Sequence, residues 1–208
     1  MRREHLAALV GQLPMILSGV LFFASGVAAL LYQIAWQRTL FGWYGVDLDS
    51  VSAIVSIFML GLGGGALVGG WLADRFAKHR ILVFALVELT IGLFGLISLD
   101  LIDSLGAKFS GEPLGIIVLL TFAVFLIPTC AMGATLPVLV TELASRTGNI
   151  GASTGLLYFI NTLGAAAGAY AASHWLLRVA GLDILTYVAA GINITIALAA
   201  FAAFRSKL

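Results

Sequence analysis

The sequence predicts an all-α membrane protein, with one domain at 1–208 that holds six transmembrane helices arranged as a 3+3 inverted repeat. Three observations predict this fold. The chain is 61% hydrophobic and only 10% charged, whereas soluble domains carry about 25% charged residues, so lipid must cover the apolar surface. Six apolar runs reach the roughly 20 residues that a helix needs to cross a bilayer. Small residues also recur at matching places in the two halves of the chain.

Short polar segments separate the six apolar runs. We expect the runs to span the membrane at about 14–40, 50–73, 81–99, 114–140, 151–176 and 184–204. The basic N-terminus leads into an apolar run too long for a signal peptide, so we expect the first span to be retained. Residues before Pro14 are expected to form a short helix at the membrane surface. Pro128 and Pro137 predict a bend in the fourth span.

Lys and Arg predict the orientation, because cytoplasmic loops are enriched in them. With the N-terminus in the cytoplasm, one membrane face receives eight of these residues and the other face three. The eight are Arg2, Arg3, Arg75, Lys78, Arg80, Arg146, Arg205 and Lys207, and the three are Arg38, Lys108 and Arg178. We therefore expect both termini in the cytoplasm and the protein in a bacterial inner (plasma) membrane.

Small residues form matching stripes in the second and fifth predicted spans. The two stripes, with four-residue spacing, are Gly61, Gly65 and Gly69, and Gly164, Gly168 and Ala172. Such a stripe lies on one helix face and lets a neighbouring backbone approach closely. Because each half would hold an odd number of spans, the second half would be inverted, as in many transporters. The alternative is that such stripes occur in any bundle of membrane helices.

A charged loop follows the second predicted span, with the sequence GWLADRFAKHR over residues 70–80. It resembles the motif G-x-L-a-D-R-x-G-R-R between spans two and three of the major facilitator superfamily. The matching residues are Gly70, Leu72, Asp74, Arg75 and Arg80, whereas Ala77 replaces a glycine. The resemblance implies a cytoplasmic latch that opens when the two halves of a transporter rock. The alternative is a basic anchor without a gating role.

Glu142 and Arg146 form a second candidate charge cluster on the same membrane face. They are four residues apart and therefore lie on one side of a helix. We expect them to pair and to engage the Asp74–Arg75 loop as part of the cytoplasmic gate. A simple solvated pair is the alternative.

Four segments along the chain make the resemblance to the major facilitator superfamily more specific. They are SGVAALLYQIAWQRTLFGWYG (25–45), FMLGLGGGALVGGWLADR (58–75), IPTCAMGATLPVLV (127–140) and TGLLYFINTLGAAAGAY (154–170). In this order they resemble the membrane portion of the fused major-facilitator/spermidine-synthase family. That family commonly carries a soluble aminopropyltransferase-like domain after the membrane part, and the sequence here ends at Leu208. The resemblance implies a half-size facilitator that is not an enzyme, with polyamines or other organic cations as substrates.

Polar side chains within the spans are the candidate binding groups, because each costs free energy in lipid unless it has a partner. Glu88 is expected to carry a proton or to bind a cationic substrate, with a structural ion pair or hydrogen bond as the alternative. Tyr32, Gln33 and Trp36 are expected to form an aromatic and amide wall for an ammonium group. For Trp36 the alternative is an aromatic belt at the membrane surface. Arg38 is expected to pair with Glu88 or an outer acid, or to extend to that surface.

The last two spans add three polar residues. Tyr158 and Asn161 lie three residues apart on one helix side, where they would line a substrate path or bond between helices. Asn193 is interpreted as an interhelical hydrogen-bonding residue. The sequence has no nucleophile–base pair, no cofactor motif and no Cys/His cluster with metal-ligand spacing. We therefore expect no catalytic site, no cofactor and no metal site.

The number of predicted spans, half that of a complete facilitator, predicts an oligomer. A facilitator builds its pathway between two pseudo-equivalent halves, whereas this chain holds six spans. We expect a parallel homodimer in the lipid bilayer that transports a small cationic substrate by alternating access. The alternative function is a non-transporting scaffold or anchor for a separate soluble aminopropyltransferase-like enzyme. The net charge of +1 gives no indication of nucleic-acid binding.

Overall fold

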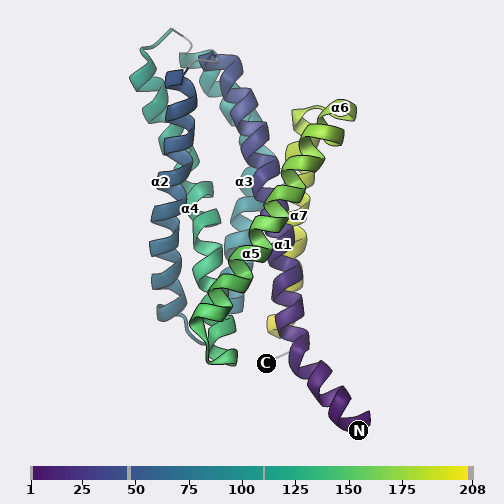
Figure 1. Cartoon of the computed structure of the whole chain (residues 1–208). Coiled ribbons are helices and arrows are strands. Elements are labelled where there is room, and N and C mark those ends of the chain that lie inside the picture. The colour runs from purple at the N-terminus through teal and green to yellow at the C-terminus, as the bar shows by residue number, and fades with distance from the viewer. Residues whose placement is uncertain (1, 46–47, 110, 206–208) are drawn as a thin grey trace.

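The computed structural model describes residues 2–45, 48–109 and 111–205, and within these ranges it contains helices and no strand (Figure 1). The helices are α1 (Arg2–Tyr44), α2 (Leu48–Arg75), α3 (Arg80–Phe109), α4 (Leu114–Thr147), α5 (Ile150–Ala171), the π-helical turn η1 (Ala172–Leu176), α6 (Leu177–Val179) and α7 (Leu182–Arg205). The predicted all-α fold class is confirmed.

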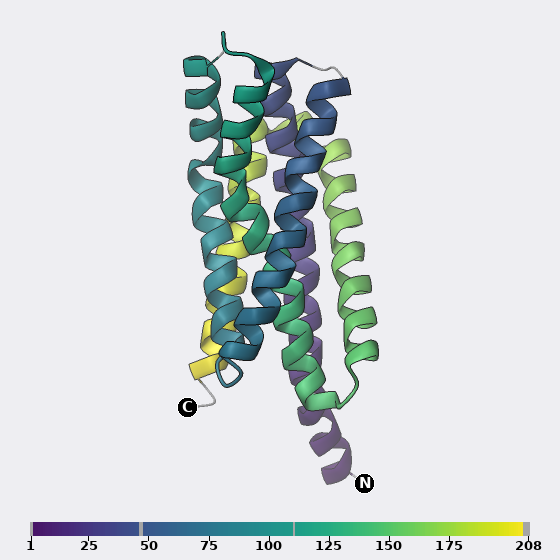
Figure 2. The same ribbon diagram turned by 90° about the vertical axis from the view of Figure 1, so that its left-hand side faces the viewer.

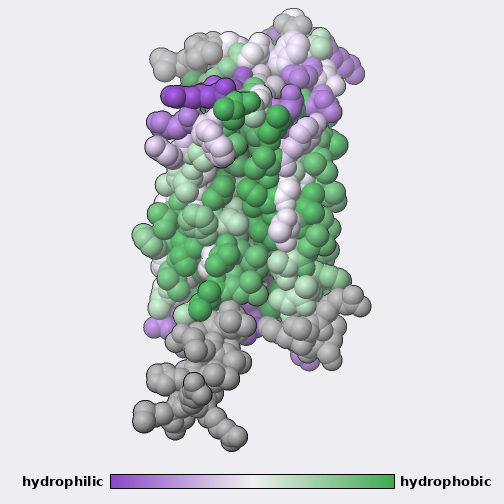
Figure 3. Space-filling model, turned by 90° about the vertical axis from the view of Figure 1, so that its right-hand side faces the viewer, coloured by the Kyte–Doolittle hydropathy of each residue, from purple (hydrophilic) through white to green (hydrophobic). Residues whose placement is uncertain are grey.

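Six helical segments among the described residues are long and apolar enough to cross a membrane. They are Met15–Trp43, Val51–Arg75, Arg80–Phe109, Gly115–Thr147, Ile150–Val179 and Leu182–Ala203. Apolar side chains form a broad band between more polar ends of the molecule (Figure 3). The number and order of the predicted spans are therefore confirmed.

The third helix is longer than predicted. It continues to Phe109 rather than ending near Leu99, so Asp100 and Asp103 lie within its last turns and not in a loop. Trp43 at the end of α1 donates from Nε1 to Asp103 Oδ1 at 2.9 Å. An apolar run ends at its first charged residue, whereas the helix continues because exposed acids are compatible with helical geometry.

Helices α1 and α4 also differ from the expected boundaries. The helix α1 is continuous from Arg2 through Pro14, so a separate short helix before Pro14 is not formed. The helix α4 continues past both Pro128 and Pro137 and ends at Thr147. Gly148 then takes a left-handed conformation with φ of 70°, which a glycine adopts without strain, and its N–H donates to the carbonyl of Ala144.

Both described ends of the chain lie at the same end of the bundle (Figure 2). The connection between α2 and α3 and the connection between α4 and α5 are at that end too. This arrangement agrees with the predicted topology, in which the termini share one membrane face with the basic loop. The assignment of that face to the cytoplasm stays a prediction.

Helix α2 packs on α4 through backbone contacts at its glycines. A Cβ atom placed on Gly65 would lie 2.1 Å from the carbonyl oxygen of Cys130. One placed on Gly69 would lie 2.5 Å from the carbonyl oxygen of Ala134. Real Cβ atoms do not approach backbone so closely, so the predicted role of this stripe in close helix packing is confirmed.

Helix α5 packs on α1 in the same way. A Cβ atom on Gly164 would lie 2.0 Å from the carbonyl oxygen of Phe23, and one on Gly168 would lie 2.6 Å from that of Val27. The stripes of α2 and α5 therefore serve equivalent helix pairs, α2 with α4 and α5 with α1. Helix α3 packs against α7, and these two helices also contact α4 and α1, respectively.

The α2–α4 contact and the α5–α1 contact are each reciprocal, and the two contacts have the same register. Gly133 of α4 faces the carbonyl oxygen of Leu62, and Gly26 of α1 faces that of Asn161, each with a 2.2 Å Cβ distance. The matching triplets have identical spacing: Phe23, Gly26 and Val27 with Cys130, Gly133 and Ala134, and Leu62, Gly65 and Gly69 with Asn161, Gly164 and Gly168. This is the pairing that a 3+3 repeat predicts.

Candidate functional site

Glu88 lies fully buried between α1, α3 and α7. Its Oε1 accepts a hydrogen bond from Ser25 Oγ at 2.7 Å, and its Oε2 accepts one from Asn193 Nδ2 at 2.5 Å. Ser25 is 6% exposed and Asn193 is 1% exposed. Within the described residues, no Lys, Arg or His side chain pairs with this carboxyl group. The expected interhelical hydrogen bond of Asn193 is confirmed, and its partner is Glu88.

Two buried polar atoms among the described residues have no hydrogen-bond partner in the protein. They are Asn193 Oδ1 and the hydroxyl of Tyr32. Asn193 uses its amide nitrogen on Glu88, so its carbonyl oxygen is left unpaired beside a carboxylate. An unpaired buried polar group costs about 1–3 kcal/mol. These atoms are therefore places where a ligand or a water molecule would stabilise the fold.

A cavity of about 160 Å³ lies beside the Glu88 cluster. Ser25 and Asn193 form part of its wall, and Glu88 lies behind them. The other polar lining residues are Gln33, Thr135 and Asn161, and the lining comes from six helices in both halves of the chain. An apolar cavity of similar volume can hold benzene, so this cavity fits one compact organic group. Gln33 and Asn161 both lie in this wall, whereas their predicted role in binding a substrate stays a prediction.

Tyr32 and Trp36 lie in the aromatic core rather than on the cavity wall. Both are fully buried, and their rings stack at a centroid distance of 4.8 Å. Trp36 Nε1 donates to Ser98 Oγ at 2.8 Å, and the rings of Phe58, Phe94 and Phe125 surround the indole. The structure therefore corrects both expectations for these residues, the ammonium wall and the surface belt. Aromatic residues four apart on a helix suit a buried face as well as a membrane surface.

Arg38 and Tyr158 do not line the cavity. Arg38 is exposed and lies thirteen residues beyond Ser25, about 20 Å along the helix, so the suggested pair with Glu88 does not form. Tyr158 is 62% exposed. Asn161 lies in the cavity wall and donates from Nδ2 to the carbonyl oxygen of Phe22 at 3.1 Å. Residues three apart differ by about 60° around a helix, which here separates an exposed side chain from a lining one.

The basic loop connects α2 to α3 over residues 76–79. Arg80 Nε donates to the carbonyl oxygen of Ala73 at 3.0 Å, so it satisfies an end carbonyl of α2. Asp74 and Arg75 are exposed, and neither has a side-chain partner among the described residues. A Cβ atom on Gly70 would meet no atom within 4 Å. The latch therefore stays a prediction, and its partner groups lie outside the contacts seen among the described residues.

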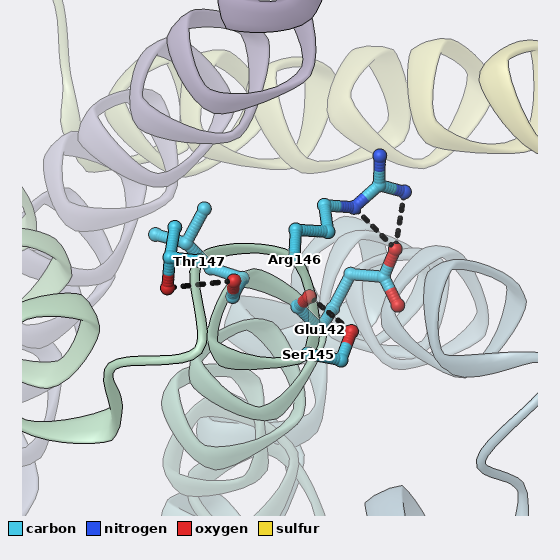
Figure 4. A network of polar contacts seen from close by, with 5 residues as sticks. Glu142, Ser145, Arg146 and Thr147 are labelled. Atoms are coloured by element: carbon cyan, nitrogen blue, oxygen red, sulfur yellow. Dashed lines mark hydrogen bonds and ion pairs between the residues drawn. The ribbon is translucent and has the colours of Figure 1, made fainter.

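Glu142 and Arg146 form the expected pair near the end of α4 (Figure 4). Arg146 donates to Glu142 Oε1 from Nε at 3.0 Å and from a terminal nitrogen at 2.5 Å. Thr147 Oγ1 lies 3.0 Å from Ser153 Oγ, which ties the end of α4 to the start of α5. The expected contact of Glu142 and Arg146 with the Asp74–Arg75 loop stays a prediction.

Sequence reasoning did not identify Ser25 or Thr135 as site residues. A single hydroxyl residue in an apolar span is common, so it carries little information on its own. Position on the helix gave no signal for Ser25 either, because Tyr32, seven residues later on the same side of α1, lies in the aromatic core and not in the cavity wall. The contact between Ser25 and Glu88 joins residues 63 positions apart, and only the fold brings them together.

A curated transporter is similar to part of this chain. The chain is 37% identical over 86 residues to the 3-(3-hydroxy-phenyl)propionate transporter of Escherichia coli (strain K12). The match covers 40% of this chain and 18% of the transporter's length. No protein-family profile matches the chain, and no solved structure matches it. The partial similarity and the six apolar helices fit an integral membrane protein of the transporter class.

Proposed function

We propose that the protein is a secondary transporter of small solutes, working as a parallel homodimer of half-size major-facilitator-like units by alternating access. The observation that carries this proposal is the cavity between the two halves of the chain with a buried carboxyl group behind its wall. Ionisable residues within a membrane mark substrate or ion pathways. Transporters built from repeats place their sites at the repeat interface.

The charge around the cavity favours a cationic solute. No Lys or Arg lines the cavity, and Glu88 is the acidic group adjoining it. The relative from Escherichia coli is named for a propionate, but its matched segment is 18% of its length. The similarity therefore supports transport and not that substrate. Polyamines and other small organic cations are the proposed class, in keeping with the resemblance to the fused major-facilitator/spermidine-synthase family.

A second copy would complete the pathway and engage the basic loop. Helix α2 exposes Leu67 and Trp71, which are 79% and 62% exposed, and helix α5 exposes Tyr158 and Phe159. The open face at Gly70 would let a partner helix approach. In the proposed arrangement Asp74 and Arg75 find their partners across the dimer. Both termini would then lie on the cytoplasmic side of a bacterial inner membrane.

Flux measurements in liposomes test the proposal. We expect saturable uptake of a radiolabelled diamine or polyamine by the purified protein, and native mass spectrometry should give a dimer. Glu88→Gln should abolish uptake, whereas Thr195→Val should not, because Thr195 is exposed and bonds only to its own helix. A folded dimer that neither binds nor transports any organic cation would remove the proposal. Co-purification of that inactive protein with a soluble aminopropyltransferase-like enzyme would favour the scaffold function instead.

A further inference from the structure

We propose that Glu88, Ser25 and Asn193 form a site for an alkali metal cation, and that this ion, rather than a proton, is coupled to transport. The solute would occupy the neighbouring cavity. The inference rests on the proposed transport function and assigns Glu88 to the ion instead of to the solute. With the ion bound, the case for a cationic solute rests on the absence of Lys and Arg from the described lining and on the family resemblance, not on the charge of Glu88.

The first argument is that Glu88, when it is ionised, has no compensating positive charge among the described residues. The side chain is fully buried, and hydrogen bonds from Ser25 and Asn193 are its polar contacts. Two neutral donors do not neutralise an ionised carboxylate, and an unpaired buried charge is costly. A bound cation would remove that cost.

The second argument is the carbonyl oxygen of Asn193, which is buried and unpaired on a residue that lines the cavity. Protonation of Glu88 alone does not give every polar atom of Asn193 a hydrogen-bond partner. If the Asn193 amide keeps its orientation, Oδ1 stays unpaired. If the amide is flipped so that Oδ1 accepts the Glu88 proton, the amide nitrogen loses its partner instead. A water molecule alone would satisfy Oδ1 but would leave the carboxylate charge in place. A proton on Glu88 together with a water molecule on Oδ1 would satisfy both groups, and a single cation would satisfy both at once; the experiment below decides between these two states.

The third argument is access. Glu88 is 0% exposed and lies behind Ser25 and Asn193, whereas the cavity of about 160 Å³ lies in front of them. Because Glu88 is not among the residues that line the cavity, a solute in the cavity would contact Ser25 and Asn193 rather than the carboxylate. This leaves the carboxylate oxygens to a ligand smaller than the solute, such as an ion.

The donor set indicates which ion is bound. The cluster presents the two oxygens of Glu88, Ser25 Oγ and Asn193 Oδ1, and hard cations prefer such oxygen ligands. It holds one carboxylate, and no group of three or more His, Cys, Asp or Glu side chains suited to a metal ion occurs in the described part of the chain. One negative charge balances a monovalent cation, so Na⁺ or Li⁺ fits better than a divalent ion.

Thermal unfolding of the purified full chain tests the site. Unfolding would be followed at constant pH and ionic strength while NaCl or LiCl replaces choline chloride. We expect a saturable rise in Tm of roughly 5–10 °C at a hundredfold excess over Kd. Glu88→Gln should abolish the rise, and Ser25→Ala, which removes one oxygen and little volume, should weaken Na⁺ binding about tenfold. Thr195→Val, on the same helix as Asn193, should bind Na⁺ like the unchanged protein.

Three outcomes would overturn the inference. The folded wild-type protein shows no shift with any alkali cation, or Ser25→Ala and Glu88→Gln leave the shift unchanged, or uptake in liposomes follows a proton gradient and needs no alkali cation. If Glu88→Gln fails to fold, binding of ²²Na⁺ to the wild-type protein and to Ser25→Ala gives the same decision. Flux is measured separately in liposomes: uptake without Na⁺ binding removes only this inference, and Na⁺ binding without uptake of any solute removes the proposed function.

Discussion

The two halves of the chain share a packing scaffold but not a chemistry. In the first half, Gly65 of α2 lies against the backbone of α4, and in the second half, Gly164 of α5 lies against that of α1 at nearly the same distance. The buried carboxylate and the stacked aromatic pair, however, belong to the first half. When the register between α1 and α4 is extended along both helices, Leu139 and Leu143 of α4 correspond to Tyr32 and Trp36 of α1.

The cavity shows the same difference. Ser25 and Met132 are equivalent in the repeat, as are Leu62 and Asn161, and all four line the cavity. Each pair has one polar and one apolar member. The repeat therefore sets the position and shape of the cavity, whereas a few substitutions within the repeat make one side of it polar. A site of this kind can acquire specificity without disturbing the helix packing.

The largest expected effect comes from the shared scaffold. Gly65→Leu and Gly164→Leu should each lose more than about 3 kcal/mol of stability, because the side chain would force two backbones apart. Gly63→Leu is the matched control, since a Cβ atom there meets nothing within 4 Å. The yield of folded protein and its Tm would measure the effect. Tolerance of Leu at one of the two buried positions alone would show that the halves do not share one scaffold.

The next effect tests the chemistry that the halves do not share. Asn193→Leu removes a donor from the buried carboxylate of Glu88 and should cost about 3 kcal/mol. The double variant Glu88→Met with Asn193→Leu should recover most of that loss, because an apolar pair of similar volume is tolerated in place of a buried polar one. Thermal unfolding of the single and double variants gives the coupling. Additive losses would mean that the two side chains act independently.

The aromatic core of the first half should give a smaller effect. Trp36→Phe removes the hydrogen bond to Ser98 and leaves a small void among the neighbouring rings, with an expected cost of about 2 kcal/mol. Trp71→Phe is the control, because that side chain is 62% exposed and should change stability by less than about 0.5 kcal/mol. Unfolding midpoints compare the two variants, and equal small losses would argue that Trp36 is not a core residue.

The smallest effects are expected at the loops that end the helices of each half. Arg80→Ala removes the donor to the carbonyl of Ala73 and should cost about 1 kcal/mol. Arg146→Ala breaks a partly exposed pair with Glu142 and should cost less than about 0.5 kcal/mol. High salt should weaken the second contact more than the first. A larger loss for Arg146→Ala would show that its cluster holds more than a solvated pair.

The site was predictable in part. Glu88 could be identified because a carboxyl group in an apolar span is rare and costly, and Gln33 and Asn161 have polar amides that suit a cavity wall. The aromatic residues were misplaced because a stripe of large rings fits both a core and a membrane surface. Ser25 was missed because its significance comes from a contact across 63 residues. The ends of α3 and α4 were missed because hydropathy reports where lipid ends, not where the helix does.

The amino-acid sequence by itself determined that the chain is a six-helix membrane protein, since apolar runs of this length have one stable form in lipid, and it determined the glycine faces on which the helices approach. The tertiary structure decided which faces meet, and therefore which polar residues share the cavity. Side-chain direction around a helix depends on crossing and register between helices. Those are properties of the assembled bundle, and they made Glu88, Ser25 and Asn193 one cluster while leaving Tyr158 and Arg38 outside it.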